Sequence, residues 1–503
     1  MLALLWGVVL RFHAIQAWKV HLSHDESISY LCAATTEGLY QETIQEYTDS
    51  LITVGSIQAF YTPPAQLQYR TVAADLAGYD IHPPLFFWAL HTGMVYTGFS
   101  PKLGPWINAI TGLLLLLLTF LLAREALGST GRALVACAIW YLSPSVVQID
   151  LEARQYQFIA LWAMASYLLS WRIAERGTNG LRVAGFTVVN ALGMLSHYYF
   201  VFVLVPGLWL MWRRHGFKSP LWIYLGSLLA SVVLFLAAFP EFFSFLSAFP
   251  GRPKPAVPYP GLKDNLVTVW LYSLDFFGGT HALRHLYRLV AVLAMAWIGW
   301  ALLSKRLPVR MEHRSLAGFL RVALVWCAGF TVLLYFVHIS PPGAVGEQYF
   351  SYFWPLLAIT LVPLAEKLIP RRAWAPVLVL YVAQLAWSFT VSVRDSEFLQ
   401  PALPASWYAE MGQGDLVVTD GWARGYLPKV MMHLPAETPL FLMRKERPDV
   451  AVCNKALYLH PAISPHDPGG FATWMSQQGF VAGEARKYDN HQYEHYRFQV
   501  FHR

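Results

Sequence analysis

Two acidic clusters interrupt an otherwise apolar chain, at His24–Glu26 and at Asp150–Arg154. Carboxylates in such clusters carry out acid–base chemistry or bind divalent cations through hard oxygen atoms. Each cluster taken alone could simply face water at a helix exit. Their expected position on one face of a membrane protein favours an active site at the membrane surface.

The composition places these clusters in a membrane protein. The 503-residue chain is 56% hydrophobic and 13% charged, whereas soluble domains carry about 25% charged residues. The formal net charge of +7 comes from basic residues in short loops between apolar segments, so we expect no nucleic-acid partner. The four cysteines have no C-x-x-C spacing, and neither a zinc site nor a disulfide framework is indicated.

The apolar segments predict a polytopic helical bundle. A transmembrane helix needs roughly 17–25 residues. The segment 83–97 is shorter and begins with two prolines, so we expect it to lie at the membrane interface. The first segment has no small-residue cleavage site and is predicted to be a spanning helix. The eleven predicted spans are 1–20, 104–123, 131–149, 155–172, 183–196, 198–212, 219–239, 285–303, 316–338, 349–366 and 374–393.

The positive-inside rule supports this choice of spans. If 83–97 does not cross, basic residues concentrate in the loops of one side, and the short turns opposite hold only Arg154. We therefore expect an integral membrane protein with its active site and C-terminal domain extracytoplasmic. The membrane is expected to be a prokaryotic plasma (inner) membrane. The predicted external segments are 21–103, 149–155, 196–198, 240–284, 339–348 and 394–503.

Further polar and aromatic residues fall on the same predicted face. They are His82 before two prolines, His197 with Tyr198 and Tyr199, His338, and Glu347, Gln348 and Tyr349. Purely structural roles stay open for two of these residues: His197 as a polar turn residue, and Gln348 as a neutral residue at a helix start. The Pro-rich segment 250–260, with Arg252 and Lys254, is predicted to be a stiff loop that could cover a site.

The last segment has a different pattern. Strand-like stretches at 415–420, 449–453 and 496–501 alternate with helical ones near 404–412, 422–434 and 468–478, which predicts a small α/β domain. The fold is therefore expected to be mainly α. Residues 1–393 would form the transmembrane module, with a large first external loop at 21–103, and residues 394–503 an external α/β domain.

The order of these motifs resembles a known family. His24–Glu26, HPPL at 82–85, EARQY at 152–156, SHYYF at 196–200 and EQYF at 347–350 are together similar to the C-type (GT-C) membrane glycosyltransferases. Within these, the chain is most similar to the family 39 branch of protein O-mannosyltransferases and aminoarabinose transferases. The resemblance covers roughly the first 370 residues and implies an inverting transfer of a sugar from a polyprenyl-phosphate-linked donor to a lipid, polysaccharide or protein acceptor at the bilayer.

The resemblance also implies roles for the residues. Asp25 matches the acidic position that acts as general base or orients the acceptor, and Glu26 is the second catalytic candidate. Arg154 is the candidate for neutralising the leaving phosphate. The expected substrate-binding residues are His82, Asp150, Glu152, Arg154, Tyr156, His197, Tyr198, Glu347, Gln348 and Tyr349.

Two implications stay open. Asp150-x-Glu152 is similar to the metal-binding acidic pair of oligosaccharyltransferases, so Asp25, Asp150 and Glu152 could bind a divalent cation such as Mg²⁺ or Mn²⁺. Relatives commonly have Glu-Arg-Tyr where this chain has Gln348 in the middle position, so a second phosphate-binding arginine is missing. Either Arg154, Arg252 and Lys254 bind the phosphate alone, or the donor differs. The alternative function is a transporter or flippase of lipid-linked sugars, although the internal repeats and discontinuous helices expected of a transporter are not evident.

Overall fold

The chain divides into two compact units. Unit 1 is Met1–Ala17, Ile81–Phe86 and Gly104–Ser396, and unit 2 is Trp18–Asp80, Phe87–Leu103 and Glu397–Arg503. Most of the segment 21–103, which the sequence analysis groups with residues 1–393, thus shares unit 2 with the C-terminal segment, and only residues 81–86 of it belong to unit 1. The computed structural model describes residues 1–20, 22–248, 276, 316–336, 347–396, 399, 415–420, 431–451, 453–461, 468–489 and 495–503. The predicted span 285–303, the loop 250–260, the helix 404–412 and His338 lie outside these residues.

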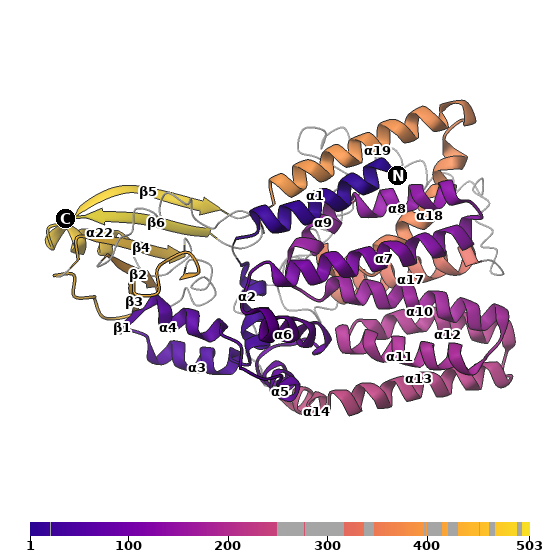
Figure 1. Cartoon of the computed structure of the whole chain (residues 1–503), viewed down its shortest axis with the longest axis horizontal. Helices are drawn as coiled ribbons and strands as arrows, with labels where there is room; N and C mark the ends of the chain where they lie inside the picture. Colours follow the sequence, from indigo (N-terminus) through magenta and orange to yellow (C-terminus); the bar gives the residue numbers. More distant parts are fainter. Residues whose placement is uncertain are drawn as a thin grey trace. The chain divides into compact units, whose positions relative to one another are not determined.

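Unit 1 is built from helices whose ends follow capping chemistry. The Ser129 and Asn179 side chains accept backbone N–H groups at the starts of α8 and α11. Helices α10 to α13 lie side by side (Figure 1). The helices are α1 (Leu2–Trp18), α7 (Leu103–Leu127), α8 (Thr130–Tyr141), α9 (Pro144–Leu151), α10 (Tyr156–Arg176), α11 (Gly180–Ser196), α12 (Phe200–His215), α13 (Ser219–Ala238), α14 (Phe242–Ala248), α17 (Leu316–Phe336), η3 (Glu347–Phe350), α18 (Trp354–Leu368) and α19 (Arg371–Arg394).

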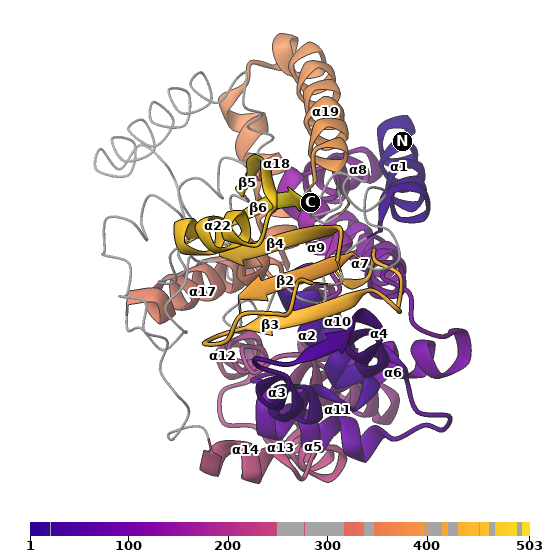
Figure 2. The same cartoon turned by 90° about the vertical axis from the view of Figure 1, so that its left-hand side faces the viewer.

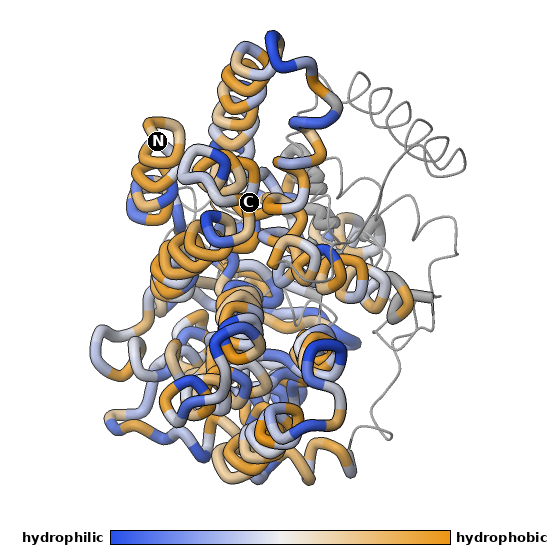
Figure 3. Tube along the Cα trace, turned by 90° about the vertical axis from the view of Figure 1, so that its right-hand side faces the viewer, coloured by the Kyte–Doolittle hydropathy of each residue, from blue (hydrophilic) through white to orange (hydrophobic). Residues whose placement is uncertain are grey.

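Several of these helices suit a bilayer. Among the described residues, α7, α13 and α19 are long and apolar enough to cross, and the pair α8 and α9, bent by 63°, could form one further span. On α19, Leu380 is 70% exposed and Trp387 66% exposed, as lipid-facing side chains would be. Figure 3 shows hydrophobic residues recurring along the helices. Every predicted span except 285–303 coincides with a helix or, at 131–149, a helix pair. The total of eleven stays a prediction.

Unit 2 contains a mixed six-stranded sheet and several short helices (Figure 2). The strand order is β1-β3-β2-β4-β6-β5, with β3, β2 and β4 parallel and the other pairs antiparallel. Its elements are α2 (His24–Ala34), α3 (Glu37–Glu46), β1 (Leu51–Thr53), α4 (Val54–Gln58), η1 (Ala59–Tyr61), α5 (Tyr69–Tyr79), α6 (Leu85–Thr97), β2 (Leu416–Asp420), β3 (Pro439–Met443), β4 (Lys455–Pro461), α22 (Pro468–Gln477), β5 (Val481–Asp489) and β6 (His495–His502).

The C-terminal predictions are confirmed in part. Strands β2 and β6 match the stretches 415–420 and 496–501, and α22 matches the predicted helix at 468–478. Its Phe471 ring stacks on Tyr458 of β4, with the ring centroids 4.1 Å apart. The strand predicted at 449–453 is wrong. The Asp449 carboxylate accepts the Ala451 N–H at 2.9 Å and holds a turn there, and strand β4 begins at Lys455.

Asp49 fastens the first loop to the sheet. Strand β1 pairs with β3, opposite Pro439 to Phe441, and the Asp49 carboxylate accepts the backbone N–H groups of Arg444, Lys445 and Glu446 at 2.6, 2.9 and 3.2 Å. Partial burial raises the pKa of Asp49, but these donors together with the charge of Arg444 bring it below its usual value. The carboxylate therefore stabilises this link above its unfolded pKa of about 3.9, and the contribution is lost as the pH falls through the folded pKa.

We predict that Asp49→Ala loosens the turn after β3. Loss of a comparable capping carboxylate costs about 1 kcal/mol, which corresponds to a roughly five-fold higher opening constant. Hydrogen exchange at pH 7 should show the amides of residues 444–446 exchanging about five-fold faster. Asp449→Ala is the matched control, because that carboxylate holds only its own turn. Equal protection of residues 444–446 in wild type and Asp49→Ala would show that the carboxylate does not fasten the loop.

Candidate active site at the helix ends

The predicted site residues divide between the two units. Asp25 and Glu26 belong to unit 2, whereas the other candidates, from His82 to Tyr349, belong to unit 1. Each group is described by itself, and the meeting of Asp25 with Arg154 in one pocket stays a prediction.

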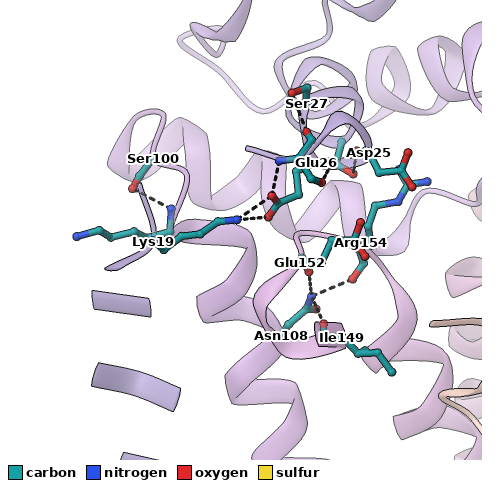
Figure 4. Close-up of polar contacts among 12 residues, drawn as sticks. Lys19, Asp25, Glu26, Ser27, Ser100, Asn108, Ile149, Glu152 and Arg154 are labelled. Carbon is teal, nitrogen blue, oxygen red and sulfur yellow. Dashed lines mark hydrogen bonds and ion pairs between the residues drawn. The ribbon is translucent and has the colours of Figure 1, made fainter. Parts of the chain in front are cut away.

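Asp25 and Glu26 differ in environment although they are neighbours. The Glu26 N–H donates to the Ser23 hydroxyl at 3.1 Å, and the Ser23 N–H donates back to the Glu26 carboxylate at 2.7 Å, forming a capping box at the start of α2. Lys19 Nζ lies 2.7 Å from both Glu26 oxygens (Figure 4). Lys19 and Glu26 are fully buried, and Asp25 is partly exposed. Asp25 is therefore the better placed of the two to meet an acceptor.

Asp150 contacts a cation that the sequence analysis did not single out. Arg11 of α1 pairs with its Oδ2, and the Gln157 amide donates to its Oδ1. Asp150 and Arg11 are fully buried. A metal ion would have to displace a guanidinium from this carboxylate, so Asp150 does not fit a metal site. The sequence feature that could have revealed this pair is Arg11 itself, a single arginine in an apolar first helix, because a charge in such a helix requires a partner.

Glu152 and Arg154 lie in the turn between α9 and α10. Both are nearly buried, with 7% and 5% exposed. The Asn108 amide lies 2.5 Å from the Glu152 carbonyl and 3.0 Å from the Arg154 carbonyl (Figure 4). Asn108 was not singled out from the sequence either, although an asparagine inside an apolar helix could have indicated a role.

A histidine–tyrosine cluster brings together four segments of unit 1. Its members are His82, Tyr156, His197, Tyr199 and Tyr349. The His197 ring centroid lies 5.7 Å from that of His82, 5.9 Å from Tyr156 and 4.6 Å from Tyr199. Tyr349 is 5.5 Å from Tyr156 and 5.9 Å from Tyr199. The structure thus gathers residues that are up to 267 positions apart in the sequence.

His197 has a defined hydrogen-bonding role in this cluster. It caps the C-terminal end of α11, and its Nδ1 accepts the Tyr199 N–H at 3.1 Å. A neutral imidazole that accepts at Nδ1 carries its proton on Nε2, and therefore donates from Nε2. Aromatic faces offer a flat apolar surface that suits the C–H groups of a sugar ring. The cluster therefore combines a donor with rings on which a sugar can stack.

Tyr198 packs outside this cluster, and Glu347 and Gln348 lie in η3. The Tyr198 ring stacks on Phe245 of α14 at 5.0 Å, and so belongs to a different aromatic group. Glu347 and Gln348 begin η3, the short helix that carries Tyr349, and Gln348 is partly exposed.

No metal site is formed by the described part of the chain, where no group of three or more His, Cys, Asp or Glu side chains is arranged to hold an ion. Glu152 and Asp25 as cation ligands stay predictions. An apolar hollow of about 260 Å³ is lined by Leu4, Leu113, Leu116, Leu117, Phe120, Leu134 and Cys137, and includes none of the predicted site residues.

Known proteins resemble the chain in sequence and in fold. Residues 81–239 match the family described as dolichyl-phosphate-mannose-protein mannosyltransferase. The structure of ArnT from Cupriavidus metallidurans bound to undecaprenyl phosphate has a TM-score of 0.53 and 13% identity, covering 99% of this chain and 97% of that one. The apo structure of the same protein has a TM-score of 0.50 and 12% identity, with the same coverage. No curated protein sequence matches the chain.

The matched segment contains four members of the histidine–tyrosine cluster and the whole second acidic cluster. The predicted resemblance to GT-C membrane glycosyltransferases of the mannosyltransferase and ArnT branch is thereby confirmed, in sequence over residues 81–239 and in fold over nearly the whole chain.

Proposed function

We propose that the protein is an inverting glycosyltransferase. It moves a hexose or pentose from a polyprenyl-phosphate-linked donor to a lipid, polysaccharide or protein acceptor on the extracytoplasmic side of the membrane. The observation that carries the proposal is the histidine–tyrosine cluster, built largely within the segment that matches the mannosyltransferase family. The fold shared with ArnT, which is bound to undecaprenyl phosphate in its structure, supports a lipid-phosphate donor.

The donor sugar is placed by the cluster. Its ring packs on the faces of Tyr156, Tyr199 and Tyr349, and the His197 Nε2–H donates to one of its hydroxyl oxygens. Arg154 pairs with the phosphate through its guanidinium, which supplies two parallel hydrogen bonds to phosphate oxygens.

The transfer itself is a single displacement. The Asp25 carboxylate takes the proton of the acceptor hydroxyl as that oxygen bonds to the anomeric carbon. The bond between the anomeric carbon and the phosphate oxygen breaks with its electron pair on that oxygen, so the lipid phosphate leaves as an anion that Arg154 neutralises. Attack opposite the leaving group inverts the anomeric configuration. Every proposed step uses side chains of this chain.

We predict that the two neighbouring carboxylates give different defects. Asp25→Asn should lower kcat by about 10²–10⁴-fold, the usual contribution of a general base, with unchanged thermal stability. Glu26→Gln removes the charge that faces buried Lys19, and should lower the free energy of unfolding by about 3–5 kcal/mol. Thermal melting and transfer of a radiolabelled polyprenyl-phosphate sugar, measured on the same purified samples, separate the two. Full transfer by Asp25→Asn would rule out its assignment as base.

We predict that His197 acts through its Nε2 donor. A Gln side chain can place an N–H near the Nε2 position, whereas Asn reproduces only the acceptor at the Nδ1 position. His197→Gln should therefore keep most of the donor affinity, and His197→Asn should raise KM for the lipid-linked sugar about ten-fold, the effect of one lost hydrogen bond of about 1.4 kcal/mol. Equal KM values for the two variants would contradict a donor role.

The alternative function, transport of lipid-linked sugars, is tested in the same reconstituted system. Passage of the intact labelled lipid across the bilayer without any acceptor-dependent transfer would favour a flippase. Sugar transfer that requires an acceptor, and that fails in Asp25→Asn, would support the enzyme.

A further inference from the structure

The turn between α9 and α10 is a break inside an apolar helical unit. Helix α9 ends at Leu151, and Glu152 has extended backbone angles, with φ −95° and ψ 132°. The Arg154 N–H donates to the Glu152 carbonyl at 2.8 Å, and α10 begins at Tyr156. Residues 152–154 therefore form a tight three-residue turn. Its remaining backbone groups need partners, because residues 152–154 are buried and buried backbone groups are almost always hydrogen-bonded.

Asn108 of α7 supplies the missing donors. Its Nδ2 lies 3.4 Å from the Ile149 carbonyl, 2.5 Å from the Glu152 carbonyl and 3.0 Å from the Arg154 carbonyl (Figure 4). The side chain is fully buried. One amide group thus ties the end of α9 to both ends of the turn, which fixes the backbone from which the Arg154 guanidinium extends.

Asp150 fixes the last turn of α9 by its side chain. Its carboxylate joins Arg11 of α1 to Gln157 of α10. The Arg11 guanidinium also donates to the Tyr141 carbonyl at 2.5 Å and lies 3.7 Å from the centre of the Tyr141 ring. On α7, a Cβ added at Gly112 would come within 3.1 Å of Asp150 Oδ1, so glycine permits this close approach. Asp150, two residues before Glu152, is thus bound by Arg11 and Gln157 and packed closely against Gly112.

We propose that Asn108 and the Arg11–Asp150 pair are positioning residues for Arg154. They hold the 152–154 turn in one place, so that the Arg154 guanidinium meets the phosphate of the lipid carrier. The phosphate partner is the part of this inference that rests on the proposed function; the anchoring of the turn does not. These residues act through the backbone of the turn and not on the substrate. A displacement of about 1 Å in a bound group can lower the rate about 100-fold. An anchor that prevents this displacement can therefore offset the free-energy cost of burying the Arg11 and Asp150 charges.

A double-mutant cycle tests the coupling between Asn108 and Arg154. Binding of undecaprenyl phosphate to the full-length purified protein is measured for wild type, Asn108→Leu, Arg154→Ala and the double variant. We expect each single variant to weaken binding at least about ten-fold, and the double variant to bind no more weakly than Arg154→Ala alone, because coupled residues are not additive. Asn190→Leu is the matched control. Asn190 is equally buried in α11 and donates to the Phe186 carbonyl at 2.8 Å, but it does not touch the turn.

Hydrogen exchange on the same variants tests the anchor without any ligand. Asn108→Leu should speed exchange of the amides of residues 152–156 by ten-fold or more, and Asn190→Leu should leave them unchanged. Slow exchange in Asn108→Leu, or additive binding losses in the cycle, would overturn the proposal. If wild type binds no undecaprenyl phosphate while exchange responds as expected, the anchor stands and the proposed donor is wrong.

The ion pair is tested by neutralising both of its members. Arg11→Gln combined with Asp150→Asn leaves no buried charge unpaired and allows an amide–amide hydrogen bond, so the protein should fold. With the pair reduced to neutral groups, exchange at residues 152–156 should again rise and binding should again be non-additive with Arg154→Ala. Wild-type exchange and affinity in this variant would show that the ion pair only joins α1 to α9 and does not position the turn.

Discussion

Charge burial is the constraint on which the rest of this structure depends. An ionised side chain at the centre of a bilayer costs about 2.5–3.5 kcal/mol on insertion scales, and a buried ion that loses its partner costs about 3–5 kcal/mol. Among the described residues, two buried ion pairs meet this constraint, Arg11 with Asp150 and Lys19 with Glu26. In each acidic cluster, one carboxylate is thus committed to a buried cation. Counting the acidic residues of the two clusters in the sequence therefore overstates the number of carboxylates that are available to a substrate.

The candidate chemistry lies where helices stop. Backbone groups at a helix end lack partners within the helix, and the structure satisfies them with the same side chains that shape the site. Ser23 and Glu26 cap α2, the His197 side chain accepts the Tyr199 N–H at the start of α12, and Asn108 binds carbonyls at and just after the end of α9. Positions and roles are therefore linked: a change that loosens one of these ends also moves a residue that is proposed to bind donor or acceptor.

Much of the architecture could be predicted from periodicity and composition. Apolar runs located the helices of unit 1, and the strands at 416–420 and 495–502 appeared as alternating stretches near the C-terminus. Local patterns failed in two ways, one from a nearby partner and one from a distant partner. The stretch 449–453 is apolar enough for a strand, but the Asp449 carboxylate turns the chain there. Strand β1 has only three residues, and it is a strand because β3, nearly 400 positions later, pairs with it. No local signal marks such a strand.

The sequence by itself determined a helical membrane protein, the residue types of a sugar-transfer site and the family that it resembles, because hydrophobic length and short motifs are local properties. Only the tertiary structure decided which of those residues act together. It gathered His82, Tyr156, His197 and Tyr349 from separate segments, and it gave Asp150 to Arg11 and Glu26 to Lys19. The physical reason is that burial and pairing depend on neighbours in space. The sequence gives the residue type of a carboxylate, but it does not tell whether a cation or a substrate lies next to it.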